Sequence, residues 1–125
     1  MVENKQRVGL LLSDDLMFAS RITGTARGLG LTIKPARSVE VLDSLVIQES
    51  PGCVILDLAN PTLELAGLLG QLRQTCSSMP RVVAYGSHVD AAGLKAARDA
   101  GCDVVLPRSA FVEQLPTALP EWMGQ

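Results

Sequence analysis

The stretch Cys53-Val54-Ile55-Leu56-Asp57-Leu58-Ala59-Asn60-Pro61 decides how this chain is expected to fold. Four apolar residues in a row predict a short strand that is buried on both faces. The strand ends at a single carboxylate, Asp57, and the chain then turns toward Pro61. Open α/β folds bind their ligands at the carboxyl ends of such strands. Asp57 is therefore the first candidate for a functional residue.

Short apolar runs and helical patterns alternate on both sides of this stretch. Besides the run before Asp57, we expect strands at residues 8–12, 31–33, 82–84 and 104–106. Apolar side chains at helical spacing lie between them, and Ser38 and Asp90 are suitable N-terminal caps for two of the helices. Five strands that alternate with helices predict a doubly wound α/β domain, with a parallel five-stranded sheet of order 2-1-3-4-5.

The last segment, residues 109–125, starts like a helix but contains two prolines, Pro116 and Pro120. A proline inside a helix removes a hydrogen bond and clashes with the preceding turn, at a cost of about 3 kcal/mol. We therefore expect the final helix to be short or broken, and Trp122 to pack the tail against the rest of the domain.

Length and charge limit the class of protein. The chain is expected to form a single domain over residues 1–125, with a core at about 8–119 and no attached output domain. Eleven basic and thirteen acidic residues without a basic block argue against nucleic-acid binding, and charges in every apolar run argue against a membrane span. Residues 1–7 are polar and lack a signal-peptide pattern, so the expected location is cytoplasmic.

The cysteines and the aromatic residues describe the expected core. Cys53, Cys76 and Cys102 have no metal-ligand spacing, and Cys53 and Cys102 border apolar runs. Buried, reduced thiols are therefore the expected state of these two residues. Only four residues of the chain are aromatic, which leaves Leu, Val, Ile and Ala to build most of the core.

Acidic residues end two strands that are expected to be neighbours. The first strand ends at Ser13-Asp14-Asp15, and the third ends at Asp57. In a sheet of order 2-1-3-4-5 the carboxyl ends of these strands flank one crevice, so Asp14 and Asp57 are expected to share a pocket. Two carboxylates in one pocket repel each other unless a cation neutralises them, and oxygen ligands suit Mg²⁺.

These motifs together resemble a response regulator receiver domain, in an atypical form, from about residue 8 to residue 119. The resemblance rests on residues 13–15, on residues 54–61 and on Ala100-Gly101-Cys102-Asp103 before the last strand. It implies a flavodoxin-like receiver fold in a two-component phosphorelay, in which Asp57 accepts a phosphoryl group from a histidine kinase or phosphotransfer protein. Asp14, Asp57 and the backbone carbonyl of Ala59 would then hold Mg²⁺. The domain would act as a signalling module and not as an enzyme, through contacts with a downstream protein or a second copy of the chain.

Two departures from the receiver pattern concern the acidic end of the pocket and strand four. Receivers usually carry two acids after strand one, whereas Ser13 stands at the first position here; its hydroxyl could hold a metal-bound water, and Asp15 could substitute for the missing acid. Strand four normally ends in a Ser or Thr that binds the phosphoryl group. Counting from Pro80 places Tyr85 there, and counting from Asp57 places Ser87 there, so the sequence leaves both open.

Two further departures concern strand five. Arg108 stands where receivers carry a lysine, and its guanidinium keeps the positive charge and can bind phosphate through two nitrogens. Val105 stands where receivers often carry a Tyr or Phe that changes rotamer on activation, so that switch is missing.

Three functions remain open for such a chain. The first is a stand-alone receiver that is switched by phosphorylation of Asp57. The second is a pseudo-receiver that binds partners without phosphorylation, in which Arg108 pairs permanently with Asp57. The third and weaker alternative is a small phosphatase with an aspartate nucleophile. Such phosphatases usually need an acid two residues after the nucleophile, where this chain has Ala59.

Overall fold

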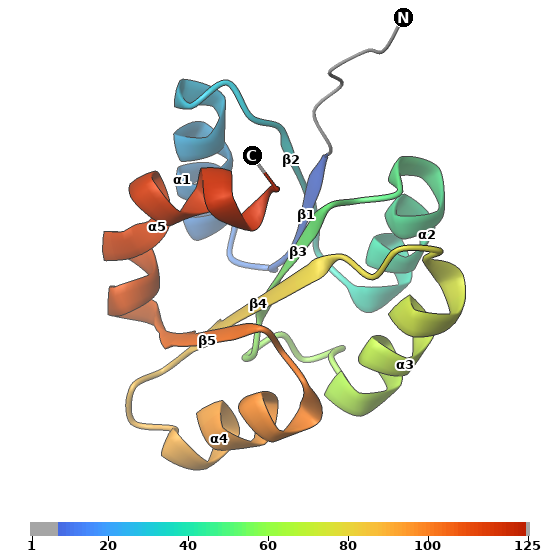
Figure 1. The fold of residues 1–125 in the computed structure, drawn as a ribbon. Helices are drawn as coiled ribbons and strands as arrows, with labels where there is room; N and C mark the ends of the chain where they lie inside the picture. Colours follow the sequence, from blue (N-terminus) through green and yellow to red (C-terminus); the bar gives the residue numbers. More distant parts are fainter. Residues whose placement is uncertain (1–7, 125) are drawn as a thin grey trace, which may run out of the picture.

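The computed structural model describes residues 8–124 as a five-stranded parallel sheet with helices on both faces (Figure 1). The strands are β1 (Gly9–Leu12), β2 (Ile33–Ala36), β3 (Cys53–Asp57), β4 (Arg81–Gly86) and β5 (Val104–Pro107). The helices are α1 (Leu16–Gly28), α2 (Val39–Glu49), α3 (Leu65–Thr75), α4 (Ala91–Ala100) and α5 (Arg108–Trp122). The strand order is β2-β1-β3-β4-β5, which confirms the predicted doubly wound fold.

Alternate residues of each strand face two separate apolar layers. Leu11, Ile55 and Val83 point to the side covered by α1 and α5, while Leu10 and Val54 point to the side covered by α2, α3 and α4 (Figure 1). A parallel sheet with helices on both faces needs apolar side chains on both, which explains the unbroken apolar runs in the sequence. Because all five strands are parallel, their carboxyl ends lie at one edge of the sheet.

The helix ends follow the predicted signals. The side chain of Ser38 accepts a hydrogen bond from the Val41 amide at 3.3 Å, and Asp90 accepts one from the Gly93 amide at 3.0 Å. Gly101 ends α4 with a left-handed φ of 111°, a conformation that glycine adopts without steric cost. Both predicted caps are confirmed.

The second strand lies further along the chain than expected. It runs over Ile33–Ala36, whereas the apolar run at residues 31–33 predicted an earlier strand. Pro35 lies inside the observed strand. On an edge strand, an amide that faces outward has no neighbouring strand to bond to, so a proline at such a position loses no hydrogen bond of the sheet. Strand β2 is an edge strand and can therefore accommodate Pro35.

Helix α5 is continuous, and the prediction of a short or broken helix was wrong. It extends over fifteen residues with both prolines inside it. Its buried face consists of Phe111, Leu115, Leu119 and Trp122, at helical spacing, whereas Pro116 is exposed. Burial of two large aromatic and two leucine side chains outweighs the local cost of the prolines. Trp122 packs the tail down as predicted.

Replacing Pro116 by alanine is expected to raise the free energy of unfolding by about 1 kcal/mol. The alanine restores an amide hydrogen inside α5, and this gain exceeds the extra freedom of the unfolded chain. Urea denaturation followed by circular dichroism measures the change. Gln114→Ala, on an exposed position of the same helix, serves as the control and should change stability little. A destabilised Pro116→Ala protein would contradict the expectation.

Two of the cysteines are buried as predicted. Cys53 and Cys102 are free thiols, and burial raises the pKa of Cys53 to about 12, so its reactive thiolate form is suppressed. None of the helices within residues 8–124 is long and apolar enough to cross a membrane.

Candidate functional site

An open cavity of about 880 Å³ lies at the carboxyl ends of the strands. Its wall carries three carboxylates, two arginines and one histidine: Asp14, Asp15, Asp57, Arg21, Arg108 and His88. Asp14 follows β1 and Asp57 ends β3, and these two strands pair directly in the sheet. The predicted shared pocket of Asp14 and Asp57 is therefore present in the structure.

Asp57 is a buried carboxylate at the floor of this cavity, with only 5% of its surface exposed. Its Oδ1 accepts a hydrogen bond from the Ala59 amide at 2.9 Å, and this bond fixes the turn after β3. Burial raises the pKa of the Asp57 carboxyl, and the charge of Asp14 adds to the effect. The Ala59 amide and the positive charge of Arg108 act in the opposite direction.

Ser13 occupies a fully interior position beside this carboxylate. It is 1% exposed, and its Oγ accepts a hydrogen bond from the Asp15 amide at 3.2 Å. The hydroxyl thus shapes the turn that leads from β1 to α1. It supplies no negative charge to the cavity, which leaves Asp14 and Asp57 as the adjacent carboxylates.

Asp15 caps helix α1 and also forms an ion pair. Its Oδ1 accepts a hydrogen bond from the Phe18 amide at 3.0 Å, and its Oδ2 lies 3.2 Å from a guanidinium nitrogen of Arg108. The Phe18 amide and Arg108 both lower the pKa of Asp15. Both oxygens of Asp15 therefore have protein partners, which weakens the prediction that Asp15 replaces a metal ligand.

Arg108 does not form the predicted resting pair with Asp57. It pairs instead with Asp15, and its guanidinium carbon lies 4.1 Å from the centroid of the Phe18 ring. A planar cation over an aromatic face is attracted by the ring, so α1 offers Arg108 two partners at once. Phe18 was not among the predicted site residues, yet it contributes to the site.

The pairing of β3 with β4 shows which of Tyr85 and Ser87 lies beside Asp57. Tyr85 on β4 lies directly opposite Asp57 on β3 and is 1% exposed. Ser87 follows the end of β4, is exposed and accepts a hydrogen bond from the Val89 amide at 3.3 Å. Ser87 still lines the cavity, but the position beside Asp57 belongs to Tyr85.

The Tyr85 hydroxyl is buried without a hydrogen-bond partner among residues 8–124. It lies close enough to Asp57 and Ser13 for each of them to influence its pKa. Burial raises the pKa of Tyr85, and the negative charge of Asp57 raises it further. A buried hydroxyl without a partner is costly, by about 1–3 kcal/mol, and such groups are rare in folded proteins.

Val105 faces away from the cavity. It belongs to the apolar layer under α2, α3 and α4, and its carbonyl accepts a hydrogen bond from Arg98 of α4 at 3.4 Å. Val105 is therefore an aliphatic core residue on the side of the sheet opposite to α1 and α5.

The oxygen atoms of the cavity suit one Mg²⁺ ion. No cluster of three or more Asp, Glu, His or Cys side chains with metal-binding geometry exists in the part of the chain that the structure describes. Mg²⁺, however, usually binds one or two carboxylates and keeps several water ligands. Asp14 and Asp57 line the same cavity, and the charge of Asp14 raises the pKa of Asp57, so a cation bound there would relieve their repulsion.

Comparisons with known proteins identify the fold. No protein-family model matches the sequence, and the search of curated proteins also found no match. A receiver domain of a response regulator from Bermanella marisrubri superimposes with a TM-score of 0.81 at 21% identity, covering 96% of this chain and 100% of that chain. The receiver domain of the Francisella response regulator 1452 gives a TM-score of 0.77 at 18% identity, covering 94% of this chain and 96% of that chain.

A third similar structure is a response regulator protein from Burkholderia pseudomallei, which contains a phosphorylated aspartic acid, a calcium ion and citrate. Its TM-score is 0.73 at 20% identity, covering 92% of this chain and 69% of that chain. The chain therefore has the fold of response regulator receiver domains, as the sequence motifs predicted.

Proposed function

We propose that this chain is a receiver-like module of two-component signal transduction that accepts a phosphoryl group on Asp57. The observation that carries the proposal is the place of Asp57: a buried carboxylate at the end of β3, in one cavity with Asp14, Ala59 and Arg108. The phosphoryl donor would be a histidine kinase or a phosphotransfer protein, and the output a contact with another protein.

The proposed reaction is the formation of an acyl phosphate. An oxygen of Asp57 forms a bond to phosphorus while the bond from phosphorus to the donor's imidazole nitrogen breaks, and that nitrogen leaves with the electron pair. Since the Ala59 amide holds Oδ1, we assign Oδ2 as the attacking atom. Mg²⁺ on Asp14, Asp57 and the Ala59 carbonyl would offset the charge of the transferring group.

Two further side chains are proposed to bind the phosphoryl oxygens. Arg108 already lies close enough to lower the pKa of Asp57, and it would reach the phosphoryl group by leaving Asp15. Ser87 lines the same cavity near its mouth. Phosphorylation would thus move Arg108 from its exposed ion pair with Asp15 to an ion pair with the phosphoryl group, which carries more negative charge.

Acetyl phosphate with Mg²⁺ is expected to add one phosphoryl group to the protein, which mass spectrometry detects. The gain should disappear in Asp57→Asn and after chelation of Mg²⁺, and Asp14→Asn should reduce it strongly. Asp99→Asn is the matched control, because Asp99 is an exposed carboxylate on α4 that pairs with Lys95. An unmodified wild-type protein at millimolar Mg²⁺ would contradict the proposal.

A phosphorylation-independent interaction module is the second candidate. The observation in its favour is Tyr85, which fills the space beside Asp57 where receivers have a small hydroxyl side chain. The sequence predicted an ion pair of Arg108 with Asp57 for this candidate, whereas in the structure Arg108 pairs with Asp15. A partner that binds wild-type and Asp57→Asn proteins equally well, without Mg²⁺, would support this candidate.

A further inference from the structure

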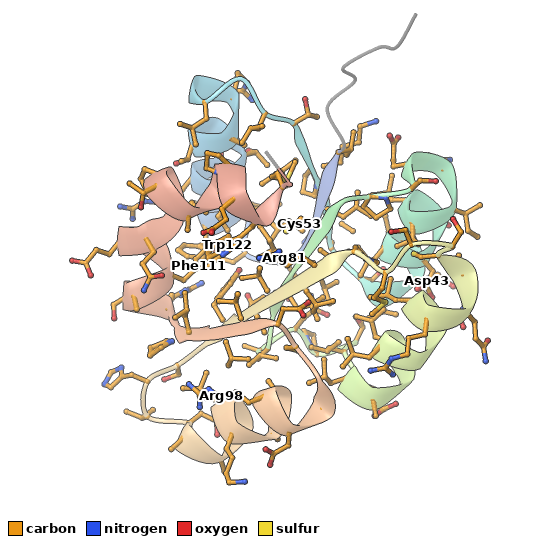
Figure 2. All side chains as sticks on the ribbon, viewed as in Figure 1. Asp43, Cys53, Arg81, Arg98, Phe111 and Trp122 are labelled. Atoms are coloured by element: carbon orange, nitrogen blue, oxygen red, sulfur yellow. The ribbon has the colours of Figure 1, made fainter. Side chains whose placement is uncertain are left out.

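All four aromatic side chains of the chain form one continuous row through the layer between the sheet and helices α1 and α5. Ring centroids are 5.2 Å apart for Phe18 and Tyr85, 4.6 Å for Tyr85 and Phe111, and 5.8 Å for Phe111 and Trp122. Phe111 and Trp122 lie together beneath α5 (Figure 2). In a core that is otherwise aliphatic, this arrangement is a distinct structural element.

One end of the row reaches the candidate phosphorylation site. The Tyr85 hydroxyl lies beside Asp57, is buried and has no partner within residues 8–124. A phosphoryl group on Asp57 would bring additional charged oxygens, which are strong hydrogen-bond acceptors, close to this hydroxyl. The free energy gained by satisfying the hydroxyl favours a displacement of the Tyr85 ring toward the modified aspartate.

The other end of the row lies at the opposite side of the sheet. Helix α5 spans fifteen residues, about 22 Å, from Arg108 beside the cavity to Trp122. Trp122 is 4% exposed and borders a second, shallow cavity together with Pro80, Arg81 and Asp103. These residues lie next to the amino-terminal ends of the strands, far from Asp57.

The ring of Phe111 packs directly against the rings of Tyr85 and Trp122. Phe111 is fully buried between Tyr85 and Trp122, and its ring lies nearly parallel to the Trp122 ring, at 15°. Aromatic side chains have few rotatable bonds, and a closely packed core has no free volume to absorb the movement of a ring. A displacement of the Tyr85 ring would therefore shift the Phe111 ring and change the environment of Trp122.

We infer that modification of Asp57 is transmitted along Tyr85 and Phe111 to Trp122, so that the carboxyl end of α5 responds to the phosphorylation state. The inference rests on the proposed function, since it requires a phosphoryl group or its analogue on Asp57. The inference places the response at the carboxyl end of α5 and not in β5. Val105 of β5 belongs to the apolar layer on the other side of the sheet from the aromatic row.

Trp122 is the only tryptophan of the chain, so its fluorescence reports directly on the end of the row. Beryllofluoride with Mg²⁺ is expected to change the emission of the wild-type protein, and acetyl phosphate should do the same in proportion to the modified fraction measured by mass spectrometry. Phe111→Leu should remain modifiable but lose more than half of the emission change per modified molecule. Leu115→Met, a buried substitution on α5 outside the row, should retain it.

Tyr85→Phe provides a second variant that keeps the ring and the packing. It removes only the unpartnered hydroxyl, so it is expected to fold and to show a smaller emission change per modified molecule. Modified wild-type protein with unchanged Trp122 emission would overturn the inference and leave the proposed function intact. Equal emission changes in wild type, Phe111→Leu and Tyr85→Phe would also overturn it. Absence of any modification would remove both the proposed function and the inference.

Discussion

Replacing Phe111 by alanine is expected to lower the free energy of unfolding by about 4 kcal/mol. Phe111 is fully buried, and its ring contacts the rings of Phe18, Tyr85 and Trp122. The substitution removes most of the side chain that holds α5 against the sheet and leaves a cavity in a core with few other large side chains. Helix α5 depends strongly on this packing, because it carries two internal prolines.

Urea denaturation followed by circular dichroism measures this loss. Phe111→Leu, which conserves most of the volume, should cost only about 1 kcal/mol. Gln114→Ala, on the exposed side of the same helix, should cost almost nothing. A loss of less than about 1 kcal/mol for Phe111→Ala would mean that α5 is held mainly by other contacts, and it would also weaken the role of the aromatic row.

Replacing Asp57 by asparagine is expected to raise the free energy of unfolding at pH values at which the Asp57 carboxyl is ionised. The carboxylate is buried next to Asp14, and burial together with this like charge raises the pKa of Asp57 above its ordinary value. Above this raised pKa the folded protein holds an ionised group in an unfavourable environment. Asparagine is neutral, and its side-chain oxygen can still accept the hydrogen bond from the Ala59 amide.

The sign of the pH dependence follows from this raised pKa. Between the ordinary pKa and the raised pKa of Asp57, the folded protein binds more protons than the unfolded chain. The contribution of Asp57 to stability therefore falls as the pH rises through this window, and it stays low above the raised pKa. The advantage of Asp57→Asn should be greatest above the raised pKa of Asp57 and should vanish when the pH falls below the ordinary value.

Urea denaturation of the wild type and Asp57→Asn at several pH values tests this expectation. Asp99→Asn, an exposed carboxylate on α4, is the control and should show little change. An Asp57→Asn protein that is less stable than the wild type at neutral pH would contradict the proposed unfavourable environment of Asp57. In that case the carboxylate would be a stabilising part of the resting structure.

Local sequence patterns predicted most of the fold. The apolar runs identified five strands, and the side chains of Ser38 and Asp90 marked two helix starts correctly. The prediction of a short or broken final helix failed because its prolines were read from their local effect alone, and the predicted second strand ended before Pro35. Pro35 lies inside an edge strand, and Pro116 lies inside α5, because the sheet edge and the buried face of the helix are properties of the whole fold.

The candidate site was predictable where it depends on strand order. Asp14 and Asp57 meet because β1 and β3 are neighbours, and that order follows from the alternation of strands and helices. The choice between Tyr85 and Ser87 was not predictable, since it depends on the exact register of β4 against β3. Phe18 was missed because its spacing is that of an ordinary core residue.

By itself the sequence determined the fold class, the position of Asp57 and the shared pocket of Asp57 and Asp14. These features depend on neighbours in the chain and on a strand order that the alternating pattern implies. Only the tertiary structure decided that Arg108 pairs with Asp15, that Tyr85 stands beside Asp57 and that four aromatic rings form one row. These contacts join residues far apart in the chain, and their distances are set by how helices pack on the sheet.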